Sequence, residues 1–323
     1  MSAWLLADIG GTQARFALAI EGRIGSIESL PTGAYAEPID AIRHFLKGQP
    51  PTALAGAVIA AAGPVEAGRC QLTNAGWLID GPTIARTLRI PDVQVVNDLQ
   101  GLAWAVPHLD GRDLVALGGG HGIAGEPVAV IAPGTGLGIA CYVPAGDHAH
   151  VLATEGGHAT WAPEDADEEA VMQLLRRRFG HVSIERVVSG SGMVAVHEVL
   201  CEQAGLPPPD LSPGEIAMAA RAEARDAASV MARRTVAMFC AALGAAAGNL
   251  ALTLGARGGV LIGGGIPPRL LEELRQSAFR QRFESKGRMG SYTRPIPTRV
   301  IVRTDPTFVG LGALSRRSGD RAP

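Results

Sequence analysis

The sequence predicts an α/β protein of two lobes, and three observations favour this. The chain has 323 residues, whereas single hydrophobic cores stop growing at roughly 250 to 300 residues. Apolar, strand-like runs alternate with helical segments, which is typical of α/β architecture. The pattern strand, glycine turn, strand occurs twice, at 3–24 and at 127–146, which indicates a duplicated lobe. We expect a ligand in a cleft between the lobes.

The first half of the chain predicts two strands, then alternating strands and helices. "AWLLADIGGTQARFALAIEGRI" reads as two strands joined at Gly10 and Gly11, residues that can take backbone angles other residues avoid. A helix around 37–47, the strand "ALAGAVIAAAG", a polar turn through "LTNAGW" and a helix near 81–89 follow. A further strand then ends at Asn97.

The second half repeats the strand, turn, strand pattern in "PVAVIAPGTGLGIACYVPAG". "APEDADEEAVMQLLRRRFG" carries Pro163 and five acids at its start and three arginines and a glycine at its end, which predicts a helix. Its acids lack the glycine and the spacing of a calcium loop. Helices at 214–254 follow, then a strand, turn and helix in "GGVLIGGGIPPRLLEELRQSAF" and a strand, turn and last helix in "RVIVRTDPTFVGLGALSRRSG".

Charge and motifs exclude several classes of function. The formal net charge of -2 leaves no broad basic surface, so we expect no nucleic-acid partner. The sequence contains no GxxxxGK[ST], no GxSxG and no HExxH, which removes a P-loop and the simplest hydrolase sites. "GHGIAG" at 120–125 fits GxGxxG, but a strand follows where a dinucleotide fold needs a helix, so we interpret it as a surface loop.

The cysteines and the hydropathy of the sequence indicate the cellular compartment in which the protein is expected. The four cysteines are far apart without metal-ligand spacing, and Asp8 comes too early for a signal peptide, which predicts a reduced, cytosolic setting. Residues 235–256 are uncharged over 22 positions, which is long enough to span a bilayer. This segment is rich in Gly and Ala, contains Asn249 and has no companion span, so we interpret it as a helix buried within a domain and expect no membrane partner.

Three glycine turns stand out: "DIGGT" at 8–12, "PGTGLG" at 133–138 and "IGGGIPP" at 262–268. Each alone needs no ligand to explain it. Together they predict phosphate binding, because glycine exposes backbone amides that form anion nests and threonine adds a hydroxyl. Asp8 would face bare phosphate unfavourably unless a divalent cation lay between them, so we expect magnesium at Asp8, held directly or through water.

A second group of polar residues is suited to a sugar. Asn97 and Asp98 end a strand, "EGGHATWAP" holds Glu155 and His158, and "GHVSIERVVSGSG" holds Glu185. Carboxylates with an amide and an imidazole match a vicinal polyol, since each hydroxyl can both donate and accept a hydrogen bond. Alone, His158 would be a structural histidine and Glu185 a solvated helix residue.

The order of "DIGGT", "VVNDLQG", "PGTGLG", "EGGH", "GHVSIERVVSG" and "LIGGGIPPR" resembles that of the bacterial glucokinases, from about residue 3 to 315. The chain lacks the cysteine-rich zinc segment of the ROK sugar kinases. The resemblance implies a two-lobed actin-like ATPase (ribonuclease H-like) fold, each lobe a mixed five-stranded sheet with flanking helices. It also implies a small α/β domain at 1–108, completed by the C-terminal helix 305–323, and a large α/β domain at 109–304.

The resemblance further implies ATP-dependent phosphorylation of D-glucose to glucose 6-phosphate, with Asp98 as the base facing the 6-hydroxyl. The implied substrate-binding residues are Asn97, Asp98, Glu155, His158 and Glu185. The implied ATP-binding residues are Asp8, Gly10, Gly11, Thr12, Gly134, Thr135, Gly136, Gly263, Gly264 and Gly265, with Asp8 also at Mg²⁺. A cytoplasmic homodimer is expected. Ser191 departs from the family, whose members often carry Pro there.

Other functions stay open at this point. The same polar residues would serve a kinase for another hexose or an amino sugar, because sequence does not fix the stereochemistry that a site reads. A catalytically silent sugar-binding regulator or paralogue would keep the fold without the reaction. An actin-like filament protein would have no use for Asn97, Asp98 and "EGGH".

Overall fold

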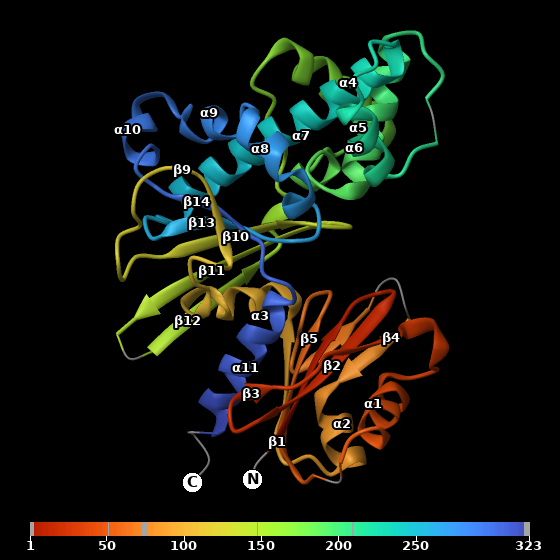
Figure 1. Ribbon diagram of the computed structural model, residues 1–323, viewed down its shortest axis with the longest axis vertical. Helices are drawn as coiled ribbons and strands as arrows, with labels where there is room; N and C mark the ends of the chain where they lie inside the picture. Colours follow the sequence, from red (N-terminus) through yellow and green to blue (C-terminus); the bar gives the residue numbers. More distant parts are fainter. Residues whose placement is uncertain (1–2, 51, 73–75, 147, 209, 320–323) are drawn as a thin grey trace. The chain divides into compact units, whose positions relative to one another are not determined.

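The computed structural model describes residues 3–50, 52–72, 76–146, 148–208 and 210–319. The chain divides into two compact units: unit 1 is Met1–Asp110 with Arg303–Pro323, and unit 2 is Gly111–Val302 (Figure 1). The expected small α/β domain at 1–108, completed by the helix 305–323, and the large α/β domain at 109–304 stay a prediction. The expected turn in "LTNAGW" falls partly on 73–75, outside the described residues.

Unit 1 is built on a mixed sheet. Its strands are β1 (Ala3–Ile9), β2 (Gln13–Ile20), β3 (Arg23–Ile24), β4 (Glu28–Pro31), β5 (Leu54–Ala61) and β8 (Val93–Asn97). β1, β5 and β8 run parallel, while β2 pairs antiparallel with β1. The sheet has six strands where five were expected, because β3 and β4 pair with different ends of β2 and so share its outer edge.

Helices cover both faces of this sheet (Figure 1). On one face lie α1 (Pro38–Lys47) and α2 (Gly81–Leu88), and on the other α3 (Asp98–Trp104) and α11 (Pro306–Gly319). Leu5, Ala7 and Ile9 of β1 belong to the core beneath α1 and α2. Because side chains alternate along a strand, Asp8 lies on the opposite face, the one covered by α11. A two-stranded sheet of β6 (Arg69–Gln71) and β7 (Leu78–Asp80) completes the unit.

Unit 2 contains a second mixed sheet, in the order β12-β11-β10-β13-β14-β9. Its strands are β9 (Leu114–Gly118), β10 (Val128–Pro133), β11 (Leu137–Ala145), β12 (His148–Thr154), β13 (Gly259–Ile262) and β14 (Thr298–Ile301). β10, β13 and β14 are parallel, and the outer strands antiparallel. Again six strands stand where five were expected, because β9 adds an antiparallel edge to β14. Residues 119–123 form the loop expected at "GHGIAG".

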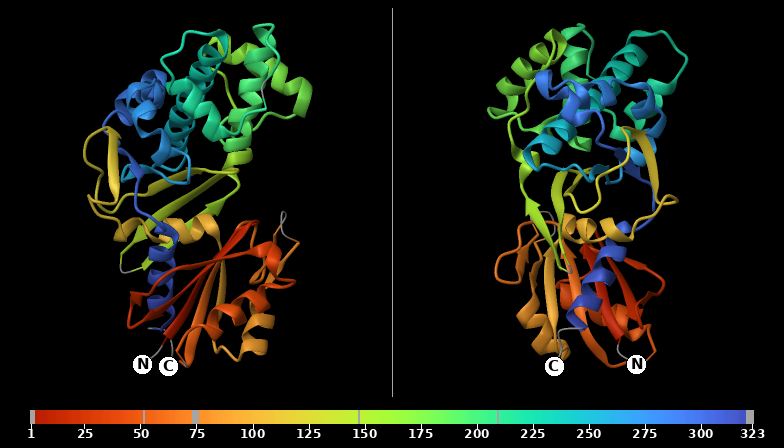
Figure 2. Two further views of the ribbon diagram at one scale, coloured as in Figure 1. Left: turned by 45° about the vertical axis from the view of Figure 1, so that its right-hand side comes forward. Right: turned by 90° about the vertical axis from the view of Figure 1, so that its left-hand side faces the viewer.

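The helices of unit 2 gather on one side of its sheet (Figure 2). They are α4 (Ala166–Phe179), α5 (Gly190–Gln203), α6 (Pro213–Arg221), α7 (Ala227–Thr253), α8 (Leu271–Gln276), α9 (Phe279–Glu284) and α10 (Gly290–Thr293). Among the described residues, α7 alone is long and apolar enough to cross a membrane, and 78% of its most apolar window is buried inside the protein. This agrees with the interpretation of 235–256 as a core helix.

The Gly and Ala content of α7 follows from how closely α9 approaches it. A Cβ added at Gly244 would lie 2.1 Å from the carbonyl oxygen of Phe279, and one at Gly248 would lie 2.5 Å from that of Phe283. Phe279 and Phe283 are themselves fully buried. The small residues that resemble a membrane span therefore make room for a neighbouring helix backbone.

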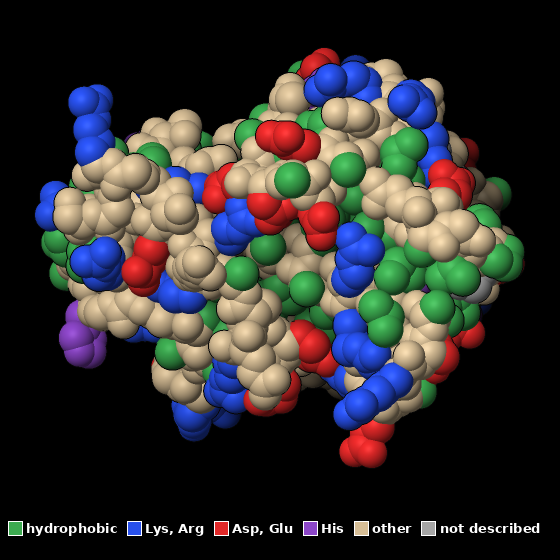
Figure 3. All heavy atoms as spheres, turned by 90° about the horizontal axis from the view of Figure 1, so that it is seen from above, with side chains coloured by type: hydrophobic (Ala, Val, Ile, Leu, Met, Phe, Trp, Pro, Cys, Tyr) green, Lys and Arg blue, Asp and Glu red, His purple; other side chains and the backbone are tan. Residues whose placement is uncertain are grey.

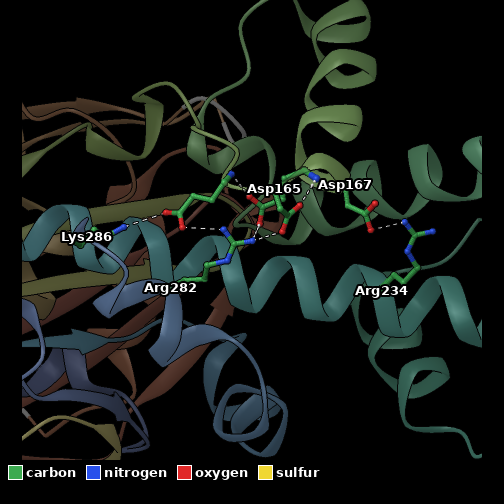
Figure 4. Close-up of polar contacts among 7 residues, drawn as sticks. Asp165, Asp167, Arg234, Arg282 and Lys286 are labelled. Carbon is green, nitrogen blue, oxygen red and sulfur yellow. Dashed lines mark hydrogen bonds and ion pairs between the residues drawn. The ribbon is translucent and has the colours of Figure 1, made fainter. Parts of the chain in front are cut away.

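The acidic segment before α4 is a helix start tied to the rest of unit 2. The helix begins at Ala166, later than Pro163 suggested, because Asp165 caps it by accepting from the backbone N–H of Glu168 at 2.9 Å. Arg282 pairs with Glu164, Asp165 and Glu168 (Figure 4). Cations of the protein itself therefore engage these carboxylates.

The surface carries charges of both signs. On the face shown in Figure 3, Lys and Arg side chains are interspersed with Asp and Glu side chains. This distribution agrees with the small net charge of -2.

Candidate active site

Asp8, near the end of β1, belongs to a charged network inside unit 1. Its carboxylate accepts a hydrogen bond from Arg15 of β2, and the same guanidinium donates to Asp305, just before α11. Arg15 also lies over the ring of Phe308, at 5.7 Å from the ring centroid. The Asp8 side chain is only 13% exposed. Burial raises the pKa of Asp8, and the adjacent Arg15 opposes that shift.

The donor set around Asp8 suits only one kind of magnesium site. The described residues contain no group of three or more His, Cys, Asp or Glu side chains that could hold a metal ion. Mg²⁺ commonly keeps several waters and binds one or two carboxylates together with substrate phosphates. The residues would therefore fit an ion held mainly by nucleotide oxygens, with Asp8 as the protein carboxylate, and Arg15 would compete with such an ion for Asp8.

The glycine turn after β1 is fixed by hydrogen bonds. The N–H of Gly10 donates to the carbonyl of Gln13 at 2.9 Å, and the Thr32 hydroxyl donates to the carbonyl of Gly11 at 2.8 Å. The N–H of Thr32 also donates to the carbonyl of Thr12 at 3.1 Å. Neither Gly10 nor Gly11 has a positive φ. The left-handed angles that glycine can take are therefore not used at either position.

Asn97 ends β8 and at the same time caps α3. Its Oδ1 accepts from the N–H groups of Leu99 at 2.9 Å and Gln100 at 3.3 Å, and its Nδ2 donates to the carbonyl of Gly63 at 3.0 Å. Sequence reasoning missed both this capping role and α3 itself. The available signal was an Asn, a favoured N-cap residue, followed at once by an acid that suits the first turn of a helix.

Asp98 is the first residue of α3. It is partly exposed, and its Oδ1 accepts from the N–H of Leu99 at 2.9 Å. Burial raises the pKa of the Cys70 thiol, and the charge of Asp98 adds to that shift. Ile9 pairs with Ala61, and Ala61 pairs with Asn97. The parallel strands of unit 1 therefore bring the turn after Asp8 and the pair Asn97–Asp98 to the same sheet edge.

In unit 2, the turn at 134–136 is tied to the start of α5. The N–H of Gly134 donates to the carbonyl of Gly136, and the N–H of Gly190 donates to the carbonyl of Gly134, both at 2.8 Å. The hydroxyl of Ser191 donates to the carbonyl of Thr135 at 3.4 Å. The departure from the family pattern at Ser191 thus contributes a contact to the turn.

The turn at 263–265 lies against the end of β10. The N–H of Gly263 donates to the carbonyl of Ile131 at 2.9 Å. Gly264 has a φ of +82°, and a Cβ there would lie 2.2 Å from the carbonyl oxygen of Pro133. Glycine is therefore required at 264, and the two glycine turns of unit 2 are neighbours.

The segments that carry Glu155, His158 and Glu185 lie side by side in unit 2. Glu155 directly precedes the short helix η3 (Gly156–His158), and its Oε2 lies 3.9 Å from Nε2 of His158. Glu185 belongs to the short helix η4 (Ile184–Arg186). The N–H of Ile184 donates to the carbonyl of Ala159 at 2.9 Å, which holds η4 beside the segment after η3.

Each unit therefore gathers its own share of the expected site residues. Unit 1 groups Asp8, the turn 10–12, Asn97 and Asp98 at one sheet edge. Unit 2 groups the two glycine turns with Glu185 and the pair Glu155–His158. Within each unit, carboxylates of the kind that can bind hydroxyls lie close to glycine turns of the kind that suits phosphate, which is chemistry appropriate to phosphoryl transfer onto a polyol.

Comparisons with known proteins agree with this chemistry. The family model described as Glucokinase matches residues 5–318. The chain is 42% identical over 314 residues to a glucokinase of Chromobacterium violaceum, covering 96% of this chain and 89% of the relative. This chain belongs to the glucokinase family. The expected ATP-dependent hexose kinase activity is thereby confirmed, and neither a kinase for another hexose nor a silent sugar-binding paralogue is favoured.

Solved structures support the fold. A glucokinase from an Antarctic psychrotroph has a TM-score of 0.87 at 33% identity, covering 98% of this chain and 99% of that one. A ROK family glucokinase from Streptomyces griseus, in complex with glucose and AMPPNP, has a TM-score of 0.66 at 20% identity, covering 98% and 100%. The expected actin-like α/β fold is confirmed. The chain also spans about half the length of several curated bifunctional relatives from Burkholderia.

Proposed function

We propose that this glucokinase-family chain transfers the γ-phosphoryl group of ATP to the 6-hydroxyl of D-glucose, with Asp98 as the general base. The observation that carries the proposal is the position of Asp98, a partly exposed carboxylate at the start of α3 and on the same sheet edge as the turn after Asp8. The glucokinase relative that matches nearly the whole chain supports the choice of substrate.

Asp98 is held for this role by its own helix. Its Oδ1 accepts from the N–H of Leu99, and the N-terminus of a helix stabilises a carboxylate. Phosphoryl transfer needs little covalent work from a protein, so alignment of the hydroxyl and neutralisation of charge supply most of the rate. Proton removal by Asp98 adds a factor of about 100 to 10,000.

We assign sugar binding to Asn97, Asp98, Glu155, His158 and Glu185. The amide of Asn97 has two N–H donors, of which one reaches the carbonyl of Gly63. The second is the one proposed to reach a glucose hydroxyl, because Oδ1 already accepts from Leu99 and Gln100. Glu155 and His158 are 63% and 61% exposed, so both side chains are accessible to a sugar.

The nucleotide is proposed to bind the glycine turns. The hydrogen bonds within each turn distinguish the glycines that shape it from the residues available to the nucleotide. Gly10, Gly134 and Gly263 each donate their N–H within the protein, so their role is to shape the turns. Contacts with phosphate are assigned to the later residues Gly11, Thr12, Thr135 and Gly136, and those with adenosine to Gly264 and Gly265. Mg²⁺, with Asp8 as its protein ligand directly or through water, would neutralise phosphate charge.

We also propose that the chain acts as a homodimer in the cytoplasm, without a nucleic-acid or membrane partner. All four cysteines are free and buried, which suits a reducing compartment. Sedimentation at micromolar concentration tests the dimer, and a mass equal to one chain would contradict it.

The function is tested with purified protein, ATP, Mg²⁺ and a panel of glucose, mannose, galactose and glucosamine, with ADP formation as the readout. We expect kcat/KM for glucose to exceed that for each other sugar by about tenfold or more, because buried polar groups left unpaired penalise a wrong hydroxyl. Chelation of Mg²⁺ should abolish turnover. Preference for glucosamine, or glucose binding without ADP formation, would contradict the proposal.

A further inference from the structure

We propose that Glu185 is a positioning residue for the phosphate turn at 134–136, in addition to its proposed contact with sugar. The inference rests on the proposed function and deepens it. Its consequence is that a side chain assigned to glucose also sets the affinity for nucleotide when no glucose is bound.

The first observation is a hydrogen bond at the end of the turn. The N–H of Leu137 donates to Oε2 of Glu185 at 2.7 Å. Leu137 is only 6% exposed, so this N–H has little access to water. Hydrogen bonds to an ionised carboxylate are stronger than those between neutral groups. The carboxylate of Glu185 therefore fixes the backbone where the turn enters β11.

The second observation is the close approach of the same oxygen to the turn itself. A Cβ added at Gly136 would lie 2.5 Å from Oε2 of Glu185, whereas one added at Gly134 would meet nothing within 4 Å. Glycine at 136 is thus what allows the carboxylate to pack directly against the turn. This accounts for one glycine of "PGTGLG" by a contact within the protein.

The third observation is that Glu185 is held from both sides. The hydroxyl of Ser189 donates to the carbonyl of Glu185 at 2.7 Å. The neighbouring Ile184 is bonded to Ala159, one residue after His158. Glu185 therefore stands at the junction between the segment proposed to bind sugar and the turn proposed to bind phosphate.

Glu155 provides the matched comparison. It is a glutamate of the same proposed sugar group, but its side chain is 63% exposed and is paired with His158. Within the described ranges, no hydrogen bond links its carboxylate to residues 134–137. Replacing Glu155 should affect sugar alone, whereas replacing Glu185 should affect sugar and nucleotide.

The experiment is calorimetric titration with Mg²⁺–AMPPNP in the absence of sugar, for wild type, Glu185→Ala, Glu185→Gln and Glu155→Ala. We expect Glu185→Ala to weaken binding by about fivefold or more, since it leaves the Leu137 N–H unpaired. Glu185→Gln keeps an oxygen that can accept this N–H and should stay within about twofold of wild type. Glu155→Ala should be unchanged.

A parallel glucose titration separates this inference from the proposed function. Glucose binding should weaken in all three variants, Glu185→Ala, Glu185→Gln and Glu155→Ala. Failure of the wild-type protein to phosphorylate glucose would refute the proposed function but would not change the result of the nucleotide titration. Wild-type nucleotide affinity in folded Glu185→Ala would overturn the inference. If that variant does not fold, Glu185→Asp replaces it, because its carboxylate is one methylene shorter and withdraws from the Leu137 N–H. Nucleotide affinity of Glu185→Asp within about twofold of wild type would then overturn the inference.

Discussion

Arg282 on α9 is expected to contribute strongly to the stability of unit 2, because it pairs with three carboxylates. It pairs with Glu164 at 3.0 Å, with Asp165, and with Glu168 at 3.1 Å (Figure 4). In Arg282→Ala, the side chain of Glu168, which is only 4% exposed, would become a buried charge without its cation. The structure therefore predicts a loss well beyond that of a surface ion pair.

The magnitude follows from the exposure of each partner. Removing one member of a buried pair costs about 3 to 5 kcal/mol. Glu164 and Asp165 are 27% and 49% exposed, so solvent screens most of their contribution. Glu168 also keeps a hydrogen bond from the N–H of Glu164 at 2.7 Å. We expect the free energy of unfolding to fall by about 2 to 4 kcal/mol, and the unfolding midpoint by about 5 to 12 °C.

The assay is urea unfolding with calorimetry at neutral pH. Arg275→Ala is the control, because Arg275 and its partner Glu272 are 44% and 67% exposed, and its change should stay under about 0.5 kcal/mol. Adding Glu168→Gln to Arg282→Ala should recover about 1 kcal/mol, since the amide carries no charge to bury. A loss in Arg282→Ala no larger than the control, or no recovery in the double variant, would refute the reasoning.

Three further predictions concern single positions. Asn97→Ala should lower the free energy of unfolding by about 1 kcal/mol or more through loss of the α3 cap and of the bond to Gly63. Asn97→Ser, also a good cap, loses only the bond to Gly63 and should cost less; urea unfolding distinguishes the two variants, and equal losses would contradict the cap. Gly264→Ala should cost about 2 kcal/mol or more, because its φ is +82° and its Cβ would meet the Pro133 carbonyl at 2.2 Å, while Gly134→Ala should cost much less; similar melting temperatures would contradict this. Burial lowers the pKa of His197 from its ordinary value of 6.5, so the folded state favours the neutral imidazole and loses stability relative to the unfolded state as the pH falls below that value. The free energy of unfolding of His197→Gln should therefore fall less than that of wild type between about pH 7.5 and 5. Parallel pH curves for the two proteins would contradict the assignment.

The type of a strand or helix could be predicted from the sequence where it depends on a local, repeated pattern of apolar residues. Both glycine hairpins, the strands β5 and β8 and the core helix α7 have the expected type, because apolar periodicity and flanking glycines report directly on local structure. The exceptions depend on neighbours in space. β3 and β4 are too short to give a pattern, and they form because β2 offers a free edge.

The roles of the candidate site residues stay a prediction, and their local contacts could not be predicted from the sequence. Sequence patterns indicated Asn97 as a sugar ligand, but its capping bonds to Leu99 and Gln100 depend on α3, which was not recognised. The contact between Glu185 and the N–H of Leu137 joins positions 48 residues apart. No spacing rule reports such a contact, because it arises only when η4 packs beside the turn.

The central claim is that Asp98 takes the proton from the glucose hydroxyl during phosphoryl transfer. The most direct test is single-turnover formation of glucose 6-phosphate by Asp98→Asn at saturating glucose and Mg²⁺–ATP. We predict a rate at least about 100-fold below that of wild type, with an unchanged unfolding midpoint, because Asn can also occupy the first turn of α3. A folded variant whose rate stays within about tenfold of wild type would contradict the claim.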